Sequence, residues 1–198
     1  MPTLTTALRT TLFIGVLLLL ASCSRNPIVD TPPLVTSLET LPQTWLIKAK
    51  LGIRTAEDSG SVTLDWQQTD TNYVIKVQGP LGQGNATISG NESHIVIEQP
   101  GKQTLYSNNA NSLIRDTFGW SLPIHDFKFW VRGIANPDNP IQSADYNPTG
   151  VLNSLQQSKW TLQYSRYKPV SQWLLPGRIK AKQDNSQLTL IIREWQLP

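Results

Sequence analysis

The sequence has 198 residues, a formal net charge of +3, 39% hydrophobic residues and 16% charged residues. This balance allows one sizeable globular domain and argues against a disordered chain or a collagen-like polymer. One cysteine excludes a disulfide framework within the chain, and with two histidines it excludes a zinc site of four cysteines or of two cysteines and two histidines. We therefore expect side-chain packing to hold the fold together.

The N-terminal segment has the pattern of a bacterial lipoprotein signal peptide. Residues 12–21 carry no polar side chain, and this run is too short to span a bilayer. It ends in Leu20-Ala21-Ser22-Cys23, which matches the lipobox, where the peptide is cut before the cysteine and the thiol is acylated. The sequence therefore predicts a signal peptide at 1–22 and lipidation of Cys23. The alternative is an ordinary secretory peptide with a chance cysteine.

Several acyl chains on Cys23 would exceed the threshold for stable anchoring, so the protein would sit on a membrane without crossing it. Residue 24 is serine and not aspartate, as in lipoproteins exported to the outer membrane. We therefore expect the protein to be anchored at the periplasmic face of the outer membrane. Removal of 1–22, whose one charged side chain is Arg9, lowers the net charge from +3 to +2. So small a charge does not indicate a nucleic-acid partner.

Residues 23–43 are expected to form the acylated cysteine and a flexible tether, because they hold four prolines and no aromatic residue. A single domain is expected from 44 to 198. It opens with alternation from Trp45 to Ile53, which is typical of a half-buried strand. The same period of two returns at Val62, Leu64 and Trp66, at Tyr73, Ile75 and Val77, at Ala86 and Ile88, and at Ile95 and Ile97. Short strands separated by Gly, Asn and Asp predict an antiparallel meander.

Two short helices are predicted to interrupt the sheet. Asn108 and Asn109 are candidate N-caps for the first, and a second is indicated by apolar residues three and four apart, namely Ile124, Phe127, Trp130 and Val131. Residues 135–150 hold three prolines among Asn and Asp and are expected to be a long surface loop. Further strands are expected at 160–164, 178–182 and 187–197.

Such a sheet could close into a packed barrel, or stay incomplete and enclose an apolar cavity that accepts acyl chains. The candidate cavity-lining residues are Trp66, Trp130, Trp160, Trp195, Tyr73 and Ile75. The alternative for these residues is plain core packing, because period-two spacing says only which face they share.

The segment Gly79-Pro80-Leu81-Gly82 is suited to a type I turn, with proline second and glycine fourth. Such a turn would place Leu81 at a tip between two strands. We consider two interpretations: a finger of Pro80, Leu81 and Gly82 that enters a membrane or a partner's apolar groove, or a leucine that folds back onto its own sheet.

Basic residues alternate onto the outward side of two predicted strands: Lys48, Lys50 and Arg54, and Arg178, Lys180 and Lys182. One interpretation is a solvated face that blunts edge pairing. The other is contact with an acidic protein or with anionic head groups.

No catalytic, metal or cofactor site is indicated by the sequence. His94 is expected in a strand and His125 beside Asp126 in a helix, each isolated. Nucleotide loops, the G-x-S-x-G motif and the H-E-x-x-H motif are absent from the sequence. We therefore expect a protein that is not an enzyme.

The chain resembles the LolB family of outer-membrane lipoprotein receptors over most of the predicted domain. The resemblance lies in an ordered series of positions: Trp45, 49–54, 64–68, 79–84, 118–120, 122–123, 129–133, Gln157, Trp160, Tyr164, Tyr167, 175–176 and 188–195. The family pattern begins Gly-Arg where this chain has Ala49-Lys50, which affects only local detail of the first strand.

The resemblance implies an incomplete antiparallel β-barrel, mainly β, with an apolar cavity capped by short helices. It also implies that the cavity takes the acyl chains of lipoproteins from the periplasmic carrier LolA, and that Leu81 helps pass them into the inner leaflet of the outer membrane. No cofactor, metal or nucleic acid is implied, and we expect a monomer. The alternatives are a structural lipoprotein that scaffolds an envelope assembly, and an anchored hydrolase with His94 or His125 in a cleft.

Overall fold

The computed structural model describes residues 41–82 and 84–198, and of Leu81 it describes the backbone alone. The predicted signal peptide at 1–22, Cys23 and the tether up to residue 40 lie outside the described residues. Within the described residues, none of the helices is long and apolar enough to cross a membrane. The lipid anchor therefore stays a prediction from the sequence.

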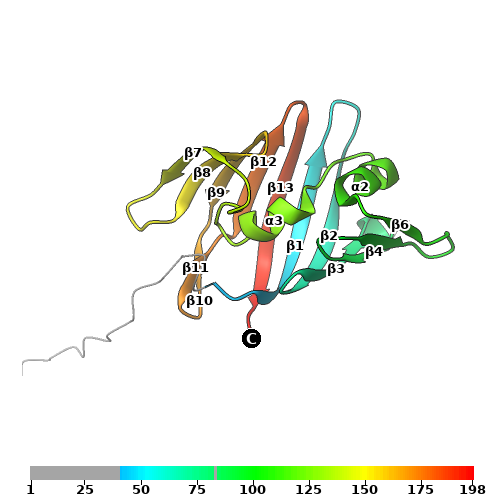
Figure 1. Cartoon of the computed structure of the whole chain (residues 1–198), viewed down its shortest axis with the longest axis horizontal. Coiled ribbons are helices and arrows are strands. Elements are labelled where there is room, and N and C mark those ends of the chain that lie inside the picture. The colour runs from blue at the N-terminus through cyan, green and yellow to red at the C-terminus, as the bar shows by residue number, and fades with distance from the viewer. Residues whose placement is uncertain (1–40, 83) are drawn as a thin grey trace, which may run out of the picture. The chain divides into compact units, whose positions relative to one another are not determined.

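Eleven strands of the described chain form one antiparallel sheet in the order β6-β5-β4-β3-β2-β1-β13-β12-β9-β8-β7. Their bounds are β1 Thr44–Arg54, β2 Ser59–Thr69, β3 Asn72–Gln78, β4 Ala86–Gly90, β5 Ile95–Glu98, β6 Leu105–Ser107, β7 Ile141–Tyr146, β8 Leu152–Gln157, β9 Trp160–Ser165, β12 Arg178–Gln183 and β13 Ser186–Gln196. A separate hairpin pairs β10 (Lys168–Val170) with β11 (Trp173–Leu175). The first and last strands pair in the middle of the sheet (Figure 1), and β6 and β7 are its edges. This confirms the prediction of a mainly β fold with an antiparallel sheet that does not close into a barrel.

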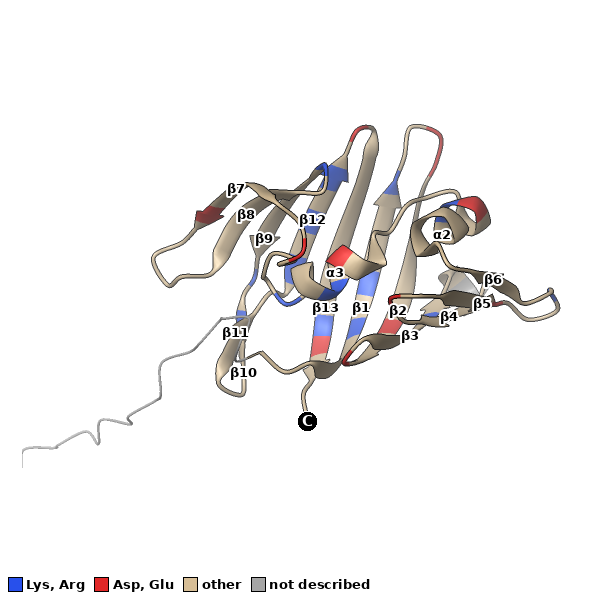
Figure 2. Ribbon diagram, viewed as in Figure 1, with Lys and Arg blue, Asp and Glu red and all other residues tan. Residues whose placement is uncertain are grey.

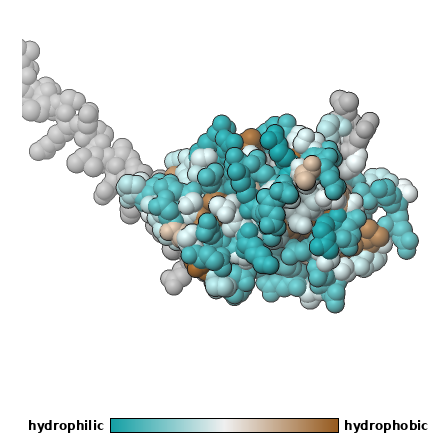
Figure 3. Space-filling view, turned by 90° about the horizontal axis from the view of Figure 1, so that it is seen from above, coloured by the Kyte–Doolittle hydropathy of each residue, from teal (hydrophilic) through white to brown (hydrophobic). Residues whose placement is uncertain are grey.

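One face of the sheet, here called the inner face, packs against helices α2 (Ala110–Phe118) and α3 (Ile124–Trp130). Figure 1 shows both helices on this side of the sheet. Along β3, Tyr73, Ile75 and Val77 are buried while the residues between them are exposed. The predicted alternation is therefore confirmed, and the opposite side is the outer face. Seen from above, the surface is mostly hydrophilic with small, separate hydrophobic areas (Figure 3).

The chemistry of its ends explains where α2 begins and stops. The side chain of Asn109 accepts a hydrogen bond from the backbone N–H of Ser112 at 3.0 Å, which confirms one of the two predicted N-caps. The helix ends at Gly119, whose φ of 77° lies in the left-handed region that glycine adopts without strain. Helix α3 follows Pro123 and buries Ile124, Phe127 and Trp130 against the sheet.

The expectation of a surface loop over residues 135–150 is wrong in part, because this segment contains β7. All six side chains of β7 are exposed, so an apolar alternation is not present to signal the strand. Strand β8, which pairs with it, was also not expected. Pairing on one side only is typical of an edge strand, whose sequence is not constrained by burial.

Gln157 attaches α3 and the segment after it to the sheet. Its buried side-chain oxygen accepts from the indole N–H of Trp130 at 2.8 Å and from the backbone N–H of Asn136 at 2.9 Å. Its amide nitrogen donates to the backbone oxygens of Asn136 and Asn139, both at 2.8 Å. One side chain thus pairs four groups that would otherwise be buried without partners.

The hydrophobic core formed by the described residues extends along the whole domain. Its buried members lie between Trp45 and Ile192, and the partly buried residues packed against them reach Leu197. A fragment of residues 24–198 therefore contains all the core residues found among the described residues, and we expect it to fold on its own.

We predict that Gln157→Leu lowers the free energy of unfolding by about 3 kcal/mol or more, because it leaves the Trp130 indole and the Asn136 backbone unpaired. Gln156→Leu is the matched control, since Gln156 is exposed on the same strand and should change stability by less than about 0.5 kcal/mol. Urea unfolding of the two variants measures the difference. Equal stability of the two would show that the Gln157 contacts do not attach α3.

Candidate functional site

The segment 79–82, here called the finger, is a turn between β3 and β4. Pro80–Gly82 forms a single 3-10 turn, and the N–H of Gly82 donates to the carbonyl of Gly79 at 3.2 Å. Gly82 has a φ of 74°, and both Pro80 and Gly82 are exposed. The backbone is therefore the tight turn that the sequence indicates. The Leu81 side chain lies outside the described residues, so its role stays a prediction.

An aromatic groove of about 470 Å³ lies beside the finger. Its apolar wall is formed by Ile53, Val62, Pro80, Phe118 and Trp120. The rings of Phe118 and Trp120 stack with centroids 5.8 Å apart. Glu57 and Asp58 of the β1–β2 turn lie at its polar side. Because Pro80 belongs to both features, the finger and the groove are parts of one site.

The groove adjoins the apolar interior of the half-open sheet. Ile53, Val62, Phe118 and Trp120 are all partly buried and pack against the core. An apolar chain placed in the groove would therefore contact the interior without crossing water.

The predicted cavity-lining residues lie on the inner face or, for Trp130, on the helix that covers it, and the four tryptophans among them fall into two aromatic clusters. Trp66, Trp130, Trp160, Tyr73 and Ile75 are buried, and Trp195 is half-buried with its indole N–H donating to the Pro176 carbonyl at 3.2 Å. Trp45 joins Trp66 and Trp195, with ring centroids 5.3 and 5.7 Å away. Trp130 contacts Phe127 at 5.6 Å and Trp160 at 6.4 Å. Their role as lining of an acyl cavity stays a prediction, because these side chains pack against one another.

Two buried glutamines, which the sequence analysis names only as positions of the family resemblance and gives no role, hold the tryptophans in place. The side-chain oxygen of Gln68 accepts from the Trp66 indole at 3.1 Å, as that of Gln157 does from Trp130. The signal for Gln68 was present, because the alternation through Leu64 and Trp66 places it on the inner face. Gln157 likewise shares the buried face with Leu155, but its partners are distant in sequence, so nothing local indicates its contacts.

Three buried polar atoms on the inner face have no hydrogen-bond partner among the described residues: Trp45 Nε1, Tyr73 Oη and Tyr164 Oη. Burial raises the pKa of Tyr73 to about 12 and the pKa of Tyr164 well above its usual value, so both hydroxyls stay protonated donors. Trp45 and Tyr73 face Gln68 from its two sides in the strand register. Each unpaired group costs about 1–3 kcal/mol, which acceptors on a bound molecule would recover.

The histidines do not form a catalytic cleft. His94 lies just before β5, not within a strand as expected, and it is exposed beside Ser93 in a turn. His125 is half-buried on α3, and desolvation is the main cause that lowers its pKa, with Lys128 adding to the effect. Within the described residues, no group of three or more potential ligands could hold a metal ion.

The model of the family described as outer membrane lipoprotein LolB matches residues 43–195. The outer-membrane lipoprotein LolB of Cellvibrio japonicus is 38% identical over 185 residues, which cover 90% of this chain and 91% of that protein. The LolB of Pseudomonas syringae pv. syringae is 36% identical over 152 residues, covering 77% of this chain and 74% of that protein.

Among solved structures, a DUF1329 family protein from Desulfovibrio piger superposes with a TM-score of 0.53 and 7% identity. The match covers 79% of this chain and 86% of that chain. At this identity the likeness concerns the fold alone.

We predict that Trp120→Ala weakens binding of an apolar fluorescent dye to the 24–198 fragment by about tenfold, because it removes one wall of the groove. Tyr106→Ala is the control, since Tyr106 is an aromatic residue 73% exposed outside the groove. Dye titration measures both affinities, and thermal unfolding checks that each variant is folded. If both variants bound the dye equally well, the groove would not be an apolar binding site.

Proposed function

We propose that this chain, which belongs to the LolB family of outer membrane lipoproteins, accepts acylated lipoproteins from a LolA-type periplasmic carrier and inserts them into the inner leaflet of the outer membrane. It does so as a monomer, without catalysis, nucleotide or cofactor. The observation that carries the proposal is the shared position of Pro80, which joins the finger to the aromatic groove. An acyl chain leaving the groove would emerge beside the finger.

The physical need for such a receptor comes from the cargo. Each methylene exposed to water costs about 0.8 kcal/mol, so a lipoprotein with several acyl chains cannot cross the periplasm unprotected. Its chains have to pass from one apolar surface to another. Transfer then proceeds without an energy source, provided that each acceptor binds the chains more strongly than the one before.

The groove wall is continuous with the apolar inner face, which gives these chains a path once the interior opens. Ile53 and Val62 lie in the groove wall and also pack against the core. Entry beyond the groove requires the interior aromatic rings to separate, because they contact one another. Helix α2 supplies Phe118 at its end and α3 supplies Trp130, so movement of these helices would open the inner face.

The unpaired donors support a cargo that has oxygen atoms as well as apolar chains. Trp45 Nε1 and the hydroxyls of Tyr73 and Tyr164 can each donate one hydrogen bond. Ester and amide carbonyls, which link acyl chains to a lipoprotein, are acceptors of this kind. A purely hydrocarbon ligand would leave these donors unpaired.

A scaffold function has one observation in its favour. Strand β7 is an edge with all side chains exposed, including Ile141 at 50% and Tyr146 at 55%, and an exposed edge can pair with another chain. A scaffold would assemble through this edge and would take up no cargo.

We predict that Leu81→Glu slows delivery of cargo into vesicles by at least about tenfold while leaving uptake from the carrier unchanged, because a carboxylate at the finger opposes entry into the membrane. Leu81→Phe should keep delivery, since it preserves the apolar character. The measurement follows a labelled lipoprotein from the carrier to the protein and then to the vesicles.

The matched control is Ile141→Glu, which places the same charge at an exposed apolar position on β7. It should deliver cargo at the normal rate. Normal delivery by Leu81→Glu would contradict the role of the finger, and failure of cargo uptake by the unaltered protein would contradict the function as a whole.

A further inference from the structure

The outer face carries a cationic patch in the middle of the sheet. Its members are Lys50 and Arg54 of β1 and Arg178, Lys180 and Lys182 of β12. The register places Arg178 and Lys50 in one row across β13, Lys182 and Arg54 in another, and Lys180 in the row between them. Two strand spacings separate β12 from β1, so facing charges are about 10 Å apart. The five cations therefore form one cluster.

The three rows of the patch carry no compensating carboxylate between β9 and β3, and the first one beyond is Asp145 of β7, in the row of Lys180. From β9 to β3, the other residues of the three rows are uncharged, and most have hydroxyl or amide side chains. The salt bridges found among the described residues include none of the five cations. Uncompensated cations on neighbouring positions repel one another, which costs stability unless an anion binds.

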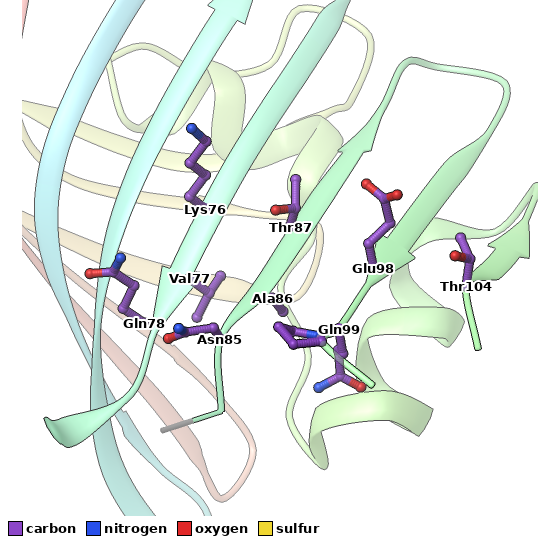
Figure 4. A pocket seen from close by; sticks show the side chains of 10 residues that line it. Lys76, Val77, Gln78, Asn85, Ala86, Thr87, Glu98, Gln99 and Thr104 are labelled. Atoms are coloured by element: carbon purple, nitrogen blue, oxygen red, sulfur yellow. The ribbon is translucent and has the colours of Figure 1, made fainter. Parts of the chain in front are cut away.

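The adjacent part of the outer face carries charges of both signs instead. In the row that starts at Glu194, Lys48 pairs with Glu194 at 3.0 Å, and Asp65, Lys76 and Glu98 follow with alternating sign. Figure 4 shows Lys76 of β3 and Glu98 of β5 on either side of Thr87 of β4, around a hollow of about 440 Å³. Mixed charge of this kind is typical of an ordinary solvated surface.

Protection of a sheet edge does not explain the patch. Lysines that blunt pairing belong on edge strands. Strands β1 and β12 each have a neighbour on both sides, and the edges are β6 and β7. The sequence-based interpretation of edge blunting is therefore wrong for these residues.

The acidic residues nearest to the patch lie in the hairpin turns at the ends of its strands and on β7, where Asp145 stands in the row of Lys180 three strands away. Figure 2 shows basic residues along β1 and β12, with acidic residues in the hairpin turns above them. These are Glu57 and Asp58 after β1 and Asp184 after β12, and the Asp58 carboxylate accepts from the Ser59 backbone N–H at 2.7 Å. Asp145 of β7 lines a hollow of about 520 Å³ together with Arg178 and Lys180.

The patch and the finger lie at the same end of the sheet. Thr63 of β2 pairs with Lys50 on one side and with Gln78, the last residue of β3, on the other. Lys50 and Gln78 therefore lie in the same row. A hollow of about 570 Å³ is lined by Arg54, Pro80, Ser59 and Ser61. The base of the finger therefore adjoins the patch directly.

We propose that this patch binds the anionic head groups of phospholipids in the leaflet that the finger enters. Arginine and lysine bind phosphate oxygens by charge-assisted hydrogen bonds, and the surrounding Ser and Thr hydroxyls add further donors. Protein interfaces are instead centred on aromatic and apolar anchors, and the apolar side chain within these rows is the half-buried Ile191. The patch therefore fits a lipid surface better than an acidic protein.

Binding of head groups would set the orientation of the domain. The tether predicted from the sequence at 23–43 would span at most about 70 Å, so it would keep the domain near the membrane without setting which face is turned toward it. Each basic residue near an anionic surface raises the affinity for that surface about fivefold. Contact through the patch would bring the finger to the same surface. The inference rests on the proposed function in one respect, namely that the finger enters the membrane.

The test measures binding of the 24–198 fragment, without carrier or cargo, to vesicles of phosphatidylethanolamine with and without phosphatidylglycerol. We expect tighter binding to the vesicles with phosphatidylglycerol, and weaker binding at high salt. The variant Lys50→Glu/Lys180→Glu should bind these vesicles at least about tenfold more weakly. Lys102→Glu/Lys159→Glu changes the net charge equally at exposed turn positions and should bind normally.

Each other outcome overturns the proposal. Equal loss in both double variants would show an effect of net charge, and equal binding to the two kinds of vesicle would show that head-group charge is not recognised. Normal vesicle binding by Lys50→Glu/Lys180→Glu with slower uptake from the carrier would assign the patch to an acidic protein surface. If that variant does not fold, Lys50→Gln/Lys180→Gln replaces it, with a smaller expected loss. Cargo uptake by the unaltered protein is measured separately, so failure here is distinguishable from failure of the proposed function.

Discussion

The structure depends on one constraint: a sheet that does not close has an apolar face that must be covered by something other than its own strands. Strands β6 and β7 are edges, so the inner face is covered by α2 and α3. The attachment of α3 is a hydrogen-bonded contact between Trp130 and Gln157 as well as apolar packing. Covering by short helices is easier to reverse than closure by strand pairing, because few backbone hydrogen bonds have to break.

The two faces of the sheet then serve different chemistry. The inner face carries aromatic rings and unpaired donors, which under the proposed function would meet acyl chains and their carbonyl groups. The outer face offers an uncompensated cluster of cations, and the base of the finger adjoins both the groove and this cluster through Pro80. The arrangement would place head groups, finger and acyl exit at one end of the molecule.

The sequence predicts those features of the structure that depend on residues close together in the chain, and it misses those that depend on distant ones. Alternation in β1 to β3 and the Asn109 cap depend on neighbours within a few residues, and both were predictable. Gln157 bonds to Asn136 and Trp130, which are 21 and 27 residues away, and no local pattern signals such contacts. Strand β7 was missed because its side chains are all exposed. The sequence also does not reveal that the basic strands lie in the middle of the sheet, because this depends on the pairing of β1 with β13 from opposite ends of the domain.

The most direct test of the account is transfer of a labelled, acylated lipoprotein from a LolA-type carrier to the 24–198 fragment in the absence of nucleotide. The account predicts that the cargo leaves the carrier and is recovered with the fragment. Cargo that stays on an active carrier in the presence of a folded fragment would contradict it, and would leave the scaffold function as the remaining explanation.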